Sequence, residues 1–203
     1  MSKASGRLEF WYEFSSTYSY IAAMRIERLA EAAGVAIDWK PFLLGPIFQA
    51  QGWNTSPFNL YPAKGRYMVR EMERLAAEHS VPFRMPAVFP QNSLQAARVA
   101  MVGAGAGWIV PFTKAVYLAE FRDGADISDR AVLEGILRDL KLDPAPIFAR
   151  IAAADLKEQL KDQTELAQES GIFGAPSFIV GDELFWGNDR LEPALALALA
   201  RRG

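Results

Sequence analysis

Four short segments of this sequence hold side chains whose types and spacing could do chemistry. The first is Ser16-Thr17-Tyr18-Ser19, which follows an aromatic-rich run and precedes a helix-favouring run. A helix start presents free N–H groups and the positive end of its dipole, and it stabilises a thiolate or another anion. A Cys-x-x-Cys pair at such a junction exchanges disulfides, whereas serines can only hydrogen-bond a thiolate that comes from elsewhere. The alternative is structural, in which Ser15, Ser16 or Thr17 simply caps the helix.

The second segment is Gly174-Ala175-Pro176-Ser177, ahead of an apolar run typical of a strand. A cis bond before Pro176 would expose the N–H and C=O of Ala175 to a peptide ligand, as a short length of open β-edge. The alternative is an ordinary trans proline that begins a strand.

The other two segments carry charge. Asp189, in Trp186-Gly187-Asn188-Asp189-Arg190, could hold a ligand ammonium group. Alternatively, Asp189 and Glu192 form a variant of the capping box before the last helix. Lys64, Arg66 and Tyr67 could address a carboxylate, and the alternative for them is a solvated helix start.

The composition excludes several kinds of chemistry. The chain of 203 residues has no cysteine and one histidine, so disulfide exchange, thiolate metal sites and a cysteine nucleophile are excluded. The net charge is −2 and the basic residues are scattered, which argues against nucleic acid as a partner. No apolar run could span a bilayer and the N-terminus lacks an apolar signal core, so we expect no membrane partner and a cytoplasmic location.

The elements that must position these segments follow from periodicity. Residues 7–14 and 35–42 alternate in polarity and predict strands, and residues 18–33 between them predict a helix that ends at Gly34. A crossover of this kind implies parallel strands. Residues 177–180 and 183–186 predict a hairpin, and a last helix is expected over 189–200.

Between these two β-containing parts the sequence has almost no strand signal. Residues 44–61 look like a loop, rich in Gly, Pro, Asn and Gln. Helical patterns follow over 62–80, 93–107, 110–121, 128–140, 144–154 and 156–170. The order is therefore β-α-β, a helical block, and β-β-α.

The joint order of these segments resembles the DsbA-related family that contains the 2-hydroxychromene-2-carboxylate isomerases and the kappa-class glutathione transferases. The resemblance covers the chain from Leu8 to Leu197. It is carried by FSSTYSYIA at Phe14–Ala22, KPFLLGPIF at Lys40–Phe48, YPAKGRYM at Tyr61–Met68, FPQN at Phe89–Asn92, GIFGAPSFIV at Gly171–Val180 and FWGNDRL at Phe185–Leu191. It implies an α/β, thioredoxin-like fold with a large inserted all-helical subdomain. Residues 1–43 and 171–203 would form the thioredoxin-like domain and residues 44–170 the insertion.

The resemblance also implies a glutathione site. In that family the first serine of an S-P-x-S segment hydrogen-bonds the glutathione sulfur, and Ser16 holds that place here, with Thr17 in place of the usual proline. Ala175, before a cis Pro176, would pair its backbone with the cysteinyl part of glutathione. Asn188 and Asp189 would hold the γ-glutamyl end, and Lys64 would pair with a carboxylate of glutathione. Weaker matches are Asn54, in a loop that differs in length by one residue, and the substrate-side residues Arg66, Tyr67, Phe89 and Asn92.

The function implied is a glutathione-dependent isomerase that interconverts 2-hydroxychromene-2-carboxylate and trans-o-hydroxybenzylidenepyruvate during aromatic hydrocarbon degradation. Its partners would be a small aromatic acid and a second copy of the chain, since the resemblance suggests a homodimer. The thiolate would add reversibly to the substrate, so that a C=C bond becomes rotatable. Two alternatives stay open: a kappa-like glutathione transferase or peroxidase, and a non-catalytic thioredoxin-fold binding module.

Overall fold

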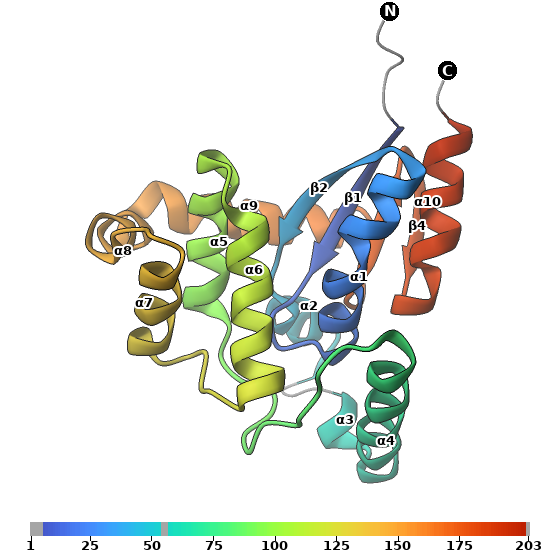
Figure 1. Cartoon of the computed structure of the whole chain (residues 1–203), viewed down its shortest axis with the longest axis horizontal. Coiled ribbons are helices and arrows are strands. Elements are labelled where there is room, and N and C mark those ends of the chain that lie inside the picture. Colours follow the sequence, from blue (N-terminus) through green and yellow to red (C-terminus); the bar gives the residue numbers. More distant parts are fainter. Residues whose placement is uncertain (1–5, 54–56, 202–203) are drawn as a thin grey trace, which may run out of the picture.

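A four-stranded sheet lies at the centre of the computed structural model, which describes residues 6–53 and 57–201 (Figure 1). The strand order is β2-β1-β3-β4. Strand β1 (Gly6–Tyr12) runs parallel to β2 (Val35–Pro41) and antiparallel to β3 (Ser177–Val180), which forms a hairpin with β4 (Glu183–Trp186). The predicted parallel crossover and the predicted hairpin are both confirmed.

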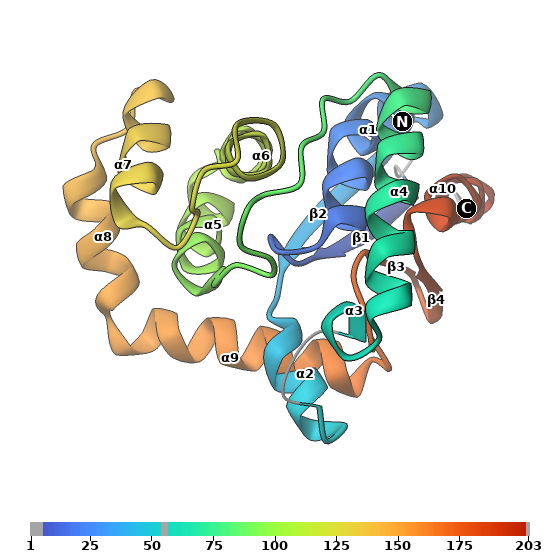
Figure 2. The ribbon, with the colours of Figure 1, turned by 90° about the horizontal axis from the view of Figure 1, so that it is seen from below.

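Helix α1 (Thr17–Ala33) makes the crossover between β1 and β2. It ends at Gly34, whose φ of 59° is left-handed and lets its N–H bond the carbonyls of Ala30 and Glu31. The last helix, α10 (Leu191–Ala200), lies beside α1 on the same face of the sheet (Figures 1 and 2). These two helices therefore cover one face of the sheet.

Alternation along β1 divides its side chains between the two faces of the sheet. Phe10 and Tyr12 stack on each other at 5.1 Å between ring centroids, on the side of the main core. Trp11 faces the other way and packs with Phe42, Ile47 and Ala167 in a second, smaller cluster. That second face is covered by α2 (Leu44–Ala50) and α9 (Ala154–Glu169).

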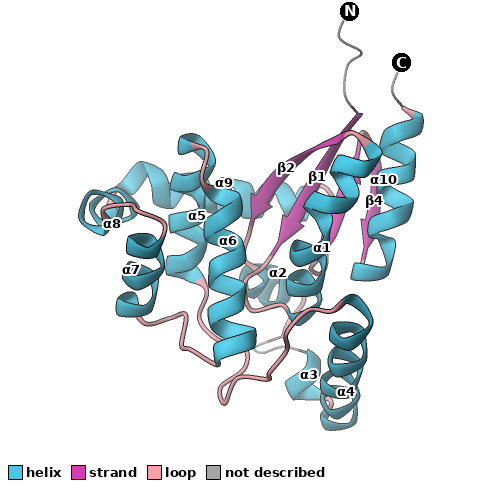
Figure 3. Cartoon of the chain, in the orientation of Figure 1, coloured by secondary structure: helices cyan, strands magenta, loops and turns pink. Residues whose placement is uncertain are grey.

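The helical block between β2 and β3 carries most of the helices (Figure 3). Its remaining elements are α3 (Pro57–Leu60), α4 (Pro62–His79), α5 (Leu94–Ala106), α6 (Ile109–Leu118), a π-helical turn (Ala119–Asp123), α7 (Arg130–Asp139) and α8 (Pro144–Ala152). Tyr117 of α6 packs on Tyr12 and Phe14, so one hydrophobic core joins the block to the sheet. The division at residues 43/44 and 170/171 remains a prediction.

The expectation of a loop over residues 44–61 is wrong in part, because this stretch contains helices α2 and α3. The helix α2 accommodates both of its apparent helix breakers, Gly45 and Pro46, in its first turn. N–H groups there have no intrahelical partner, so the missing N–H of a proline costs little. The buried Ile47 then anchors α2 on the second core cluster.

Within the described residues, no helix combines the length and the apolar character that crossing a membrane requires.

Candidate functional site at the start of helix α1

Ser16 stands between β1 and α1 and caps the helix. Its hydroxyl oxygen accepts the Ser19 N–H at 3.2 Å, and its hydroxyl proton is donated to the Ala175 carbonyl at 3.0 Å. The Ala175–Pro176 peptide bond is cis, which decides between the two alternatives that the sequence left open. Two segments 159 residues apart therefore meet at the hydroxyl group of Ser16, a residue that is only 8% exposed. The capping interpretation of Ser16 is confirmed, and it is compatible with a binding role.

The positive end of α1 lies at the same place. The N–H groups of Thr17 and Tyr18 have no intrahelical partner, because they belong to the first turn. No acidic side chain occupies that turn to neutralise the dipole. A group with negative charge beside Ser16 would therefore be stabilised by the helix and by a hydroxyl donor together.

Glu13 supports the turn that carries Ser16, and sequence reasoning missed it. Its buried carboxylate accepts the N–H of Leu44 at 3.0 Å and that of Ser15 at 3.3 Å, and it also receives the Ser93 hydroxyl. Burial raises the pKa of Glu13, while these hydrogen bonds act in the opposite direction. One side chain thus ties the Ser15–Ser16 turn to the starts of α2 and α5.

Gln91 makes a second connection that sequence reasoning missed. The Ser15 hydroxyl donates to the Gln91 carbonyl, and the Gln91 side chain donates to the Ala125 carbonyl at 3.1 Å and accepts the Ile127 N–H at 2.7 Å. The segment around Gln91 is thereby fixed next to Ser15.

The two predicted substrate-side residues in this segment differ in their surroundings. Phe89 is half-buried and its ring lies 6.3 Å from that of Phe121. Asn92 is exposed, and its side-chain oxygen accepts the Leu94 N–H at 3.0 Å at the start of α5. Asn92 therefore has a local structural role that the sequence did not suggest.

Asn188 and Asp189 point in different directions. Asn188 is buried, and its side-chain oxygen accepts a hydrogen bond from Arg25 of α1 at 3.0 Å. Arg25 also pairs with Glu192, so it fixes this turn to α1. The Asp189 side chain is 70% exposed and pairs with Arg190 at 2.9 Å, which leaves its carboxylate open to a ligand.

The capping-box interpretation of Asp189 is wrong. Residues Asn188–Arg190 form a 3-10 turn that runs directly into α10, so the residue flanking the helix is Arg190 and no side chain caps it. Glu192, the other half of the supposed box, bonds Arg25 instead.

Tyr18 lies within electrostatic reach of Asp189 and of Tyr67 and Glu71 on α4. It is half-buried, and its pKa is raised by burial and by the nearby charges of Glu71, Tyr67 and Asp189. The Thr17 hydroxyl meets the Met68 sulfur at 3.5 Å, which holds α4 against the start of α1. The sequence contained Tyr18 in the Ser16–Ser19 motif, but nothing in the sequence indicated this position.

Lys64, Arg66 and Tyr67 are exposed on the first turns of α4. The Tyr67 hydroxyl lies 3.4 Å from Glu71, a residue of the same helix. In the part of the chain that the structure describes, no contact joins Lys64 or Arg66 to Ser16 or Asp189. Asn54 lies outside the described residues.

Glu120 is a buried carboxyl group close to this site. It lies in the π-helical turn, is fully buried, and neither of its carboxyl oxygens has a hydrogen-bond partner. Burial holds its pKa well above the usual range, and the carboxylates of Glu13 and Asp126 add to that effect. Glu120 is therefore protonated in the folded protein over a pH range in which it ionises in the unfolded chain.

This proton makes stability depend on pH in a defined direction. The folded state raises the pKa of Glu120 above its value in the unfolded chain. The contribution of Glu120 to the free energy of unfolding is therefore complete below its pKa in the unfolded chain, and it is lost as pH rises towards its pKa in the folded protein. In the wild type the free energy of unfolding should therefore fall as pH rises above 5. We expect Glu120→Gln to make this slope less steep, by up to about 1.4 kcal/mol per pH unit. Urea unfolding at several pH values measures this slope. Glu169→Gln, at an exposed position on α9, is the matched control, and equal slopes for the two variants would contradict the prediction.

Comparisons with known proteins give these positions a family context. The model of the DSBA-like thioredoxin domain matches residues 7–199. The 2-hydroxychromene-2-carboxylate isomerase of Sphingobium xenophagum is 33% identical over 189 residues, which cover 91% of this chain and 94% of the relative. Glutathione S-transferase kappa 2 of Caenorhabditis elegans is 26% identical and covers 95% and 91% of the two chains.

Among solved structures, one of a 2-hydroxychromene-2-carboxylate isomerase superposes with a TM-score of 0.85 at 26% identity. The superposition covers 96% of this chain and 95% of the other. These similarities confirm the family resemblance, the thioredoxin-like fold class and the expectation of an isomerase.

Proposed function

Since the chain belongs to the DSBA-like thioredoxin family and to its group of 2-hydroxychromene-2-carboxylate isomerases, we propose that it isomerises such a carboxylate with the thiol of bound glutathione. The substrate and product would be 2-hydroxychromene-2-carboxylate and trans-o-hydroxybenzylidenepyruvate. The observation that carries the proposal is the meeting of the Ser16 hydroxyl, the α1 N-terminus and the Ala175 carbonyl in a chain without cysteine. That arrangement suits a sulfur anion which the protein cannot supply itself.

The residues present fit the chemical groups of glutathione. Its sulfur would lie against Ser16 and the N–H groups of the first turn of α1. Its ammonium group matches the open carboxylate of Asp189, and one of its carboxylates matches the exposed Lys64. Asn188 supports this arrangement indirectly, because its side-chain oxygen already bonds Arg25.

When bound, glutathione supplies a thiol that can add reversibly to a conjugated carbon and so make a C=C bond rotatable. Ser16 contributes its one hydroxyl proton, which would turn from the Ala175 carbonyl towards the sulfur. Its oxygen is held in place because it accepts the Ser19 N–H. Ser16 therefore acts as an activator that lowers the thiol pKa, and Arg66 is available for the carboxylate of the small aromatic acid.

We expect Asp189→Ala to weaken the binding of reduced glutathione roughly ten-fold or more, because a charged hydrogen bond is worth about 1.5–3 kcal/mol. Titration calorimetry measures the dissociation constant. Asp182→Ala is the matched control, since Asp182 is also exposed and also pairs with an arginine, but lies in the β3–β4 turn. Failure of the wild-type protein to bind glutathione at millimolar concentration would contradict the cofactor assignment.

The kappa-class relatives favour a second function for the same site, a glutathione transferase. Conjugation of glutathione to a chlorinated nitroarene, followed in the same preparation, distinguishes the two. A transferase would consume glutathione with each turnover, whereas an isomerase would leave its concentration unchanged. The homodimer remains a prediction, which light scattering on the purified protein would check.

A further inference from the structure

A pocket of about 240 Å³ opens between α5, α7, α8 and α9, and it shares no residue with the Ser16 site. Figure 2 shows α7 and α8 at the end of the molecule opposite α1, α4 and α10. The lining of the pocket includes Arg98, Arg130 and Lys157 but no acidic side chain. A pocket smaller than a typical drug-sized site suits a small ligand. The positive charge of the lining favours an anion.

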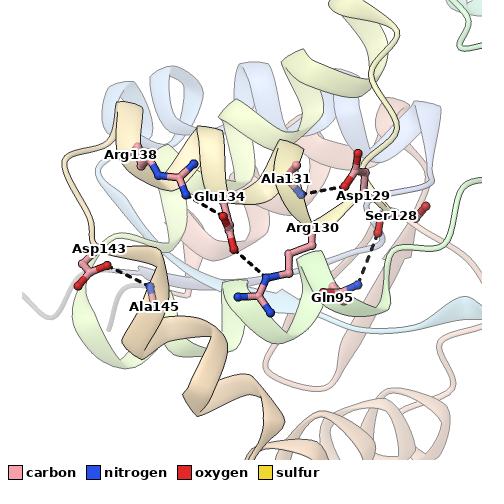
Figure 4. A network of polar contacts seen from close by, with 9 residues as sticks. All are labelled: Gln95, Ser128, Asp129, Arg130, Ala131, Glu134, Arg138, Asp143 and Ala145. Atoms are coloured by element: carbon pink, nitrogen blue, oxygen red, sulfur yellow. Dashed lines mark hydrogen bonds and ion pairs between the residues drawn. The ribbon is translucent and has the colours of Figure 1, made fainter.

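The cations of this pocket are largely uncompensated. Arg130 bonds Glu134 at 2.7 Å, but the other oxygen of Glu134 is taken by Arg138, also at 2.7 Å (Figure 4). Arg98 and Lys157 form no ion pair with any residue that the structure describes. Lys157 lies in the first turn of α9, where the one acidic residue, Asp155, pairs with Arg150 at 2.6 Å and not with Lys157.

Arg98 supplies an independent observation. Its Nε atom is buried and has no hydrogen-bond partner. A buried donor of this kind loses its hydration without compensation unless something in the pocket accepts its proton. A carboxylate is the natural acceptor, because its two oxygens match the planar fork of a guanidinium group.

The part of the pocket that α8 lines is apolar. Phe148, Ile151 and Ala152 of α8 line it, and the Arg130 guanidinium lies 4.4 Å from the centre of the Phe148 ring. That cation–π contact holds Arg130 at the boundary between the charged and the apolar sides. We propose that this pocket binds a small aromatic carboxylate, with the carboxylate on Arg98 and Lys157 and the ring against α8.

Benzoate is the probe for the test, with its uncharged analogue benzamide and inorganic phosphate beside it. Titration of the full-length protein, followed by amide resonances in nuclear magnetic resonance, gives the dissociation constant and the place of binding. We expect Arg98→Met to weaken benzoate binding roughly ten- to hundred-fold, as expected for loss of a charged hydrogen bond. Lys157→Met, which changes only the first turn of α9, should weaken it by a smaller factor and keeps the test valid if Arg98→Met is unstable.

Arg138→Met is the matched control, because Arg138 bonds the same Glu134 but does not line the pocket. Its affinity for benzoate should equal that of the wild type. Shifts confined to α5, the start of α7, α8 and the start of α9 would support the proposal. Four results would overturn it: no binding of benzoate, equal binding by Lys157→Met and the wild type, equal binding of benzamide, or phosphate bound as tightly as benzoate.

Discussion

Ser16→Ala should lower kcat/KM for isomerisation at neutral pH by roughly 100- to 1000-fold, the usual cost of removing a donor that stabilises an anion at a reacting centre. Without this donor the thiol pKa returns towards that of free glutathione. The deficit should therefore shrink as pH rises, because the thiolate then forms unaided. Initial rates across a pH series measure this, and the ultraviolet absorbance of the bound thiolate gives the pKa directly.

The control for this variant must separate binding from capping. Loss of the Ser16 cap should also cost about 1 kcal/mol of stability, which thermal unfolding would report independently. Ser15→Ala removes the neighbouring hydroxyl, whose proton goes to Gln91 rather than to Ala175. It should leave the thiol pKa unchanged. An unaltered rate and an unaltered thiol pKa in Ser16→Ala would contradict the role given to Ser16.

Glu13→Ala should have the largest effect on stability, a loss of about 2–5 kcal/mol. The substitution leaves the half-buried N–H groups of Ser15 and Leu44 without their acceptor, at roughly 1–3 kcal/mol each. It also frees the turn that carries Ser16, so KM for glutathione should rise. Urea unfolding and steady-state kinetics measure the two effects.

Glu9→Ala is the control for Glu13, because Glu9 lies on strand β1, which ends just before Glu13, and among the described residues its side chain accepts only the Trp11 indole N–H, at 2.8 Å. We expect it to cost about 1 kcal/mol and to leave KM unchanged. Glu13→Gln keeps one acceptor oxygen and should recover part of the lost stability. Equal losses in Glu9→Ala and Glu13→Ala would show that Glu13 does not organise the site.

Local signals in the sequence predicted the parts of the fold that local rules determine. The alternation in β1 and β2, Gly34 after α1 and Gly181-Asp182 in the hairpin all indicate their elements directly. The same rules failed at residues 44–50, where Gly45 and Pro46 were interpreted as loop residues. Their positions in the first turn of α2, where a proline is tolerated, could not be known in advance.

The site was predictable only where a motif marked it. Ser16 and Ala175 stand in recognisable segments, and the structure brings them together. Arg25 and Glu13 stand in no motif, and Gln91 lies in the FPQN segment without a role that the segment indicates. The distant partners of these three residues lie 31 to 167 residues away in the sequence. A buried charge acquires its function only when the fold supplies its partners, and single-sequence patterns do not contain that information.

The most direct test of the account is the isomerisation of 2-hydroxychromene-2-carboxylate by protein freed of glutathione, with reduced glutathione or S-methylglutathione added back. The account predicts negligible turnover without glutathione, full activity with it, and no activity with the S-methyl analogue, which should instead compete for the site. Full activity in the absence of any thiol would contradict the claim that the reacting sulfur belongs to bound glutathione.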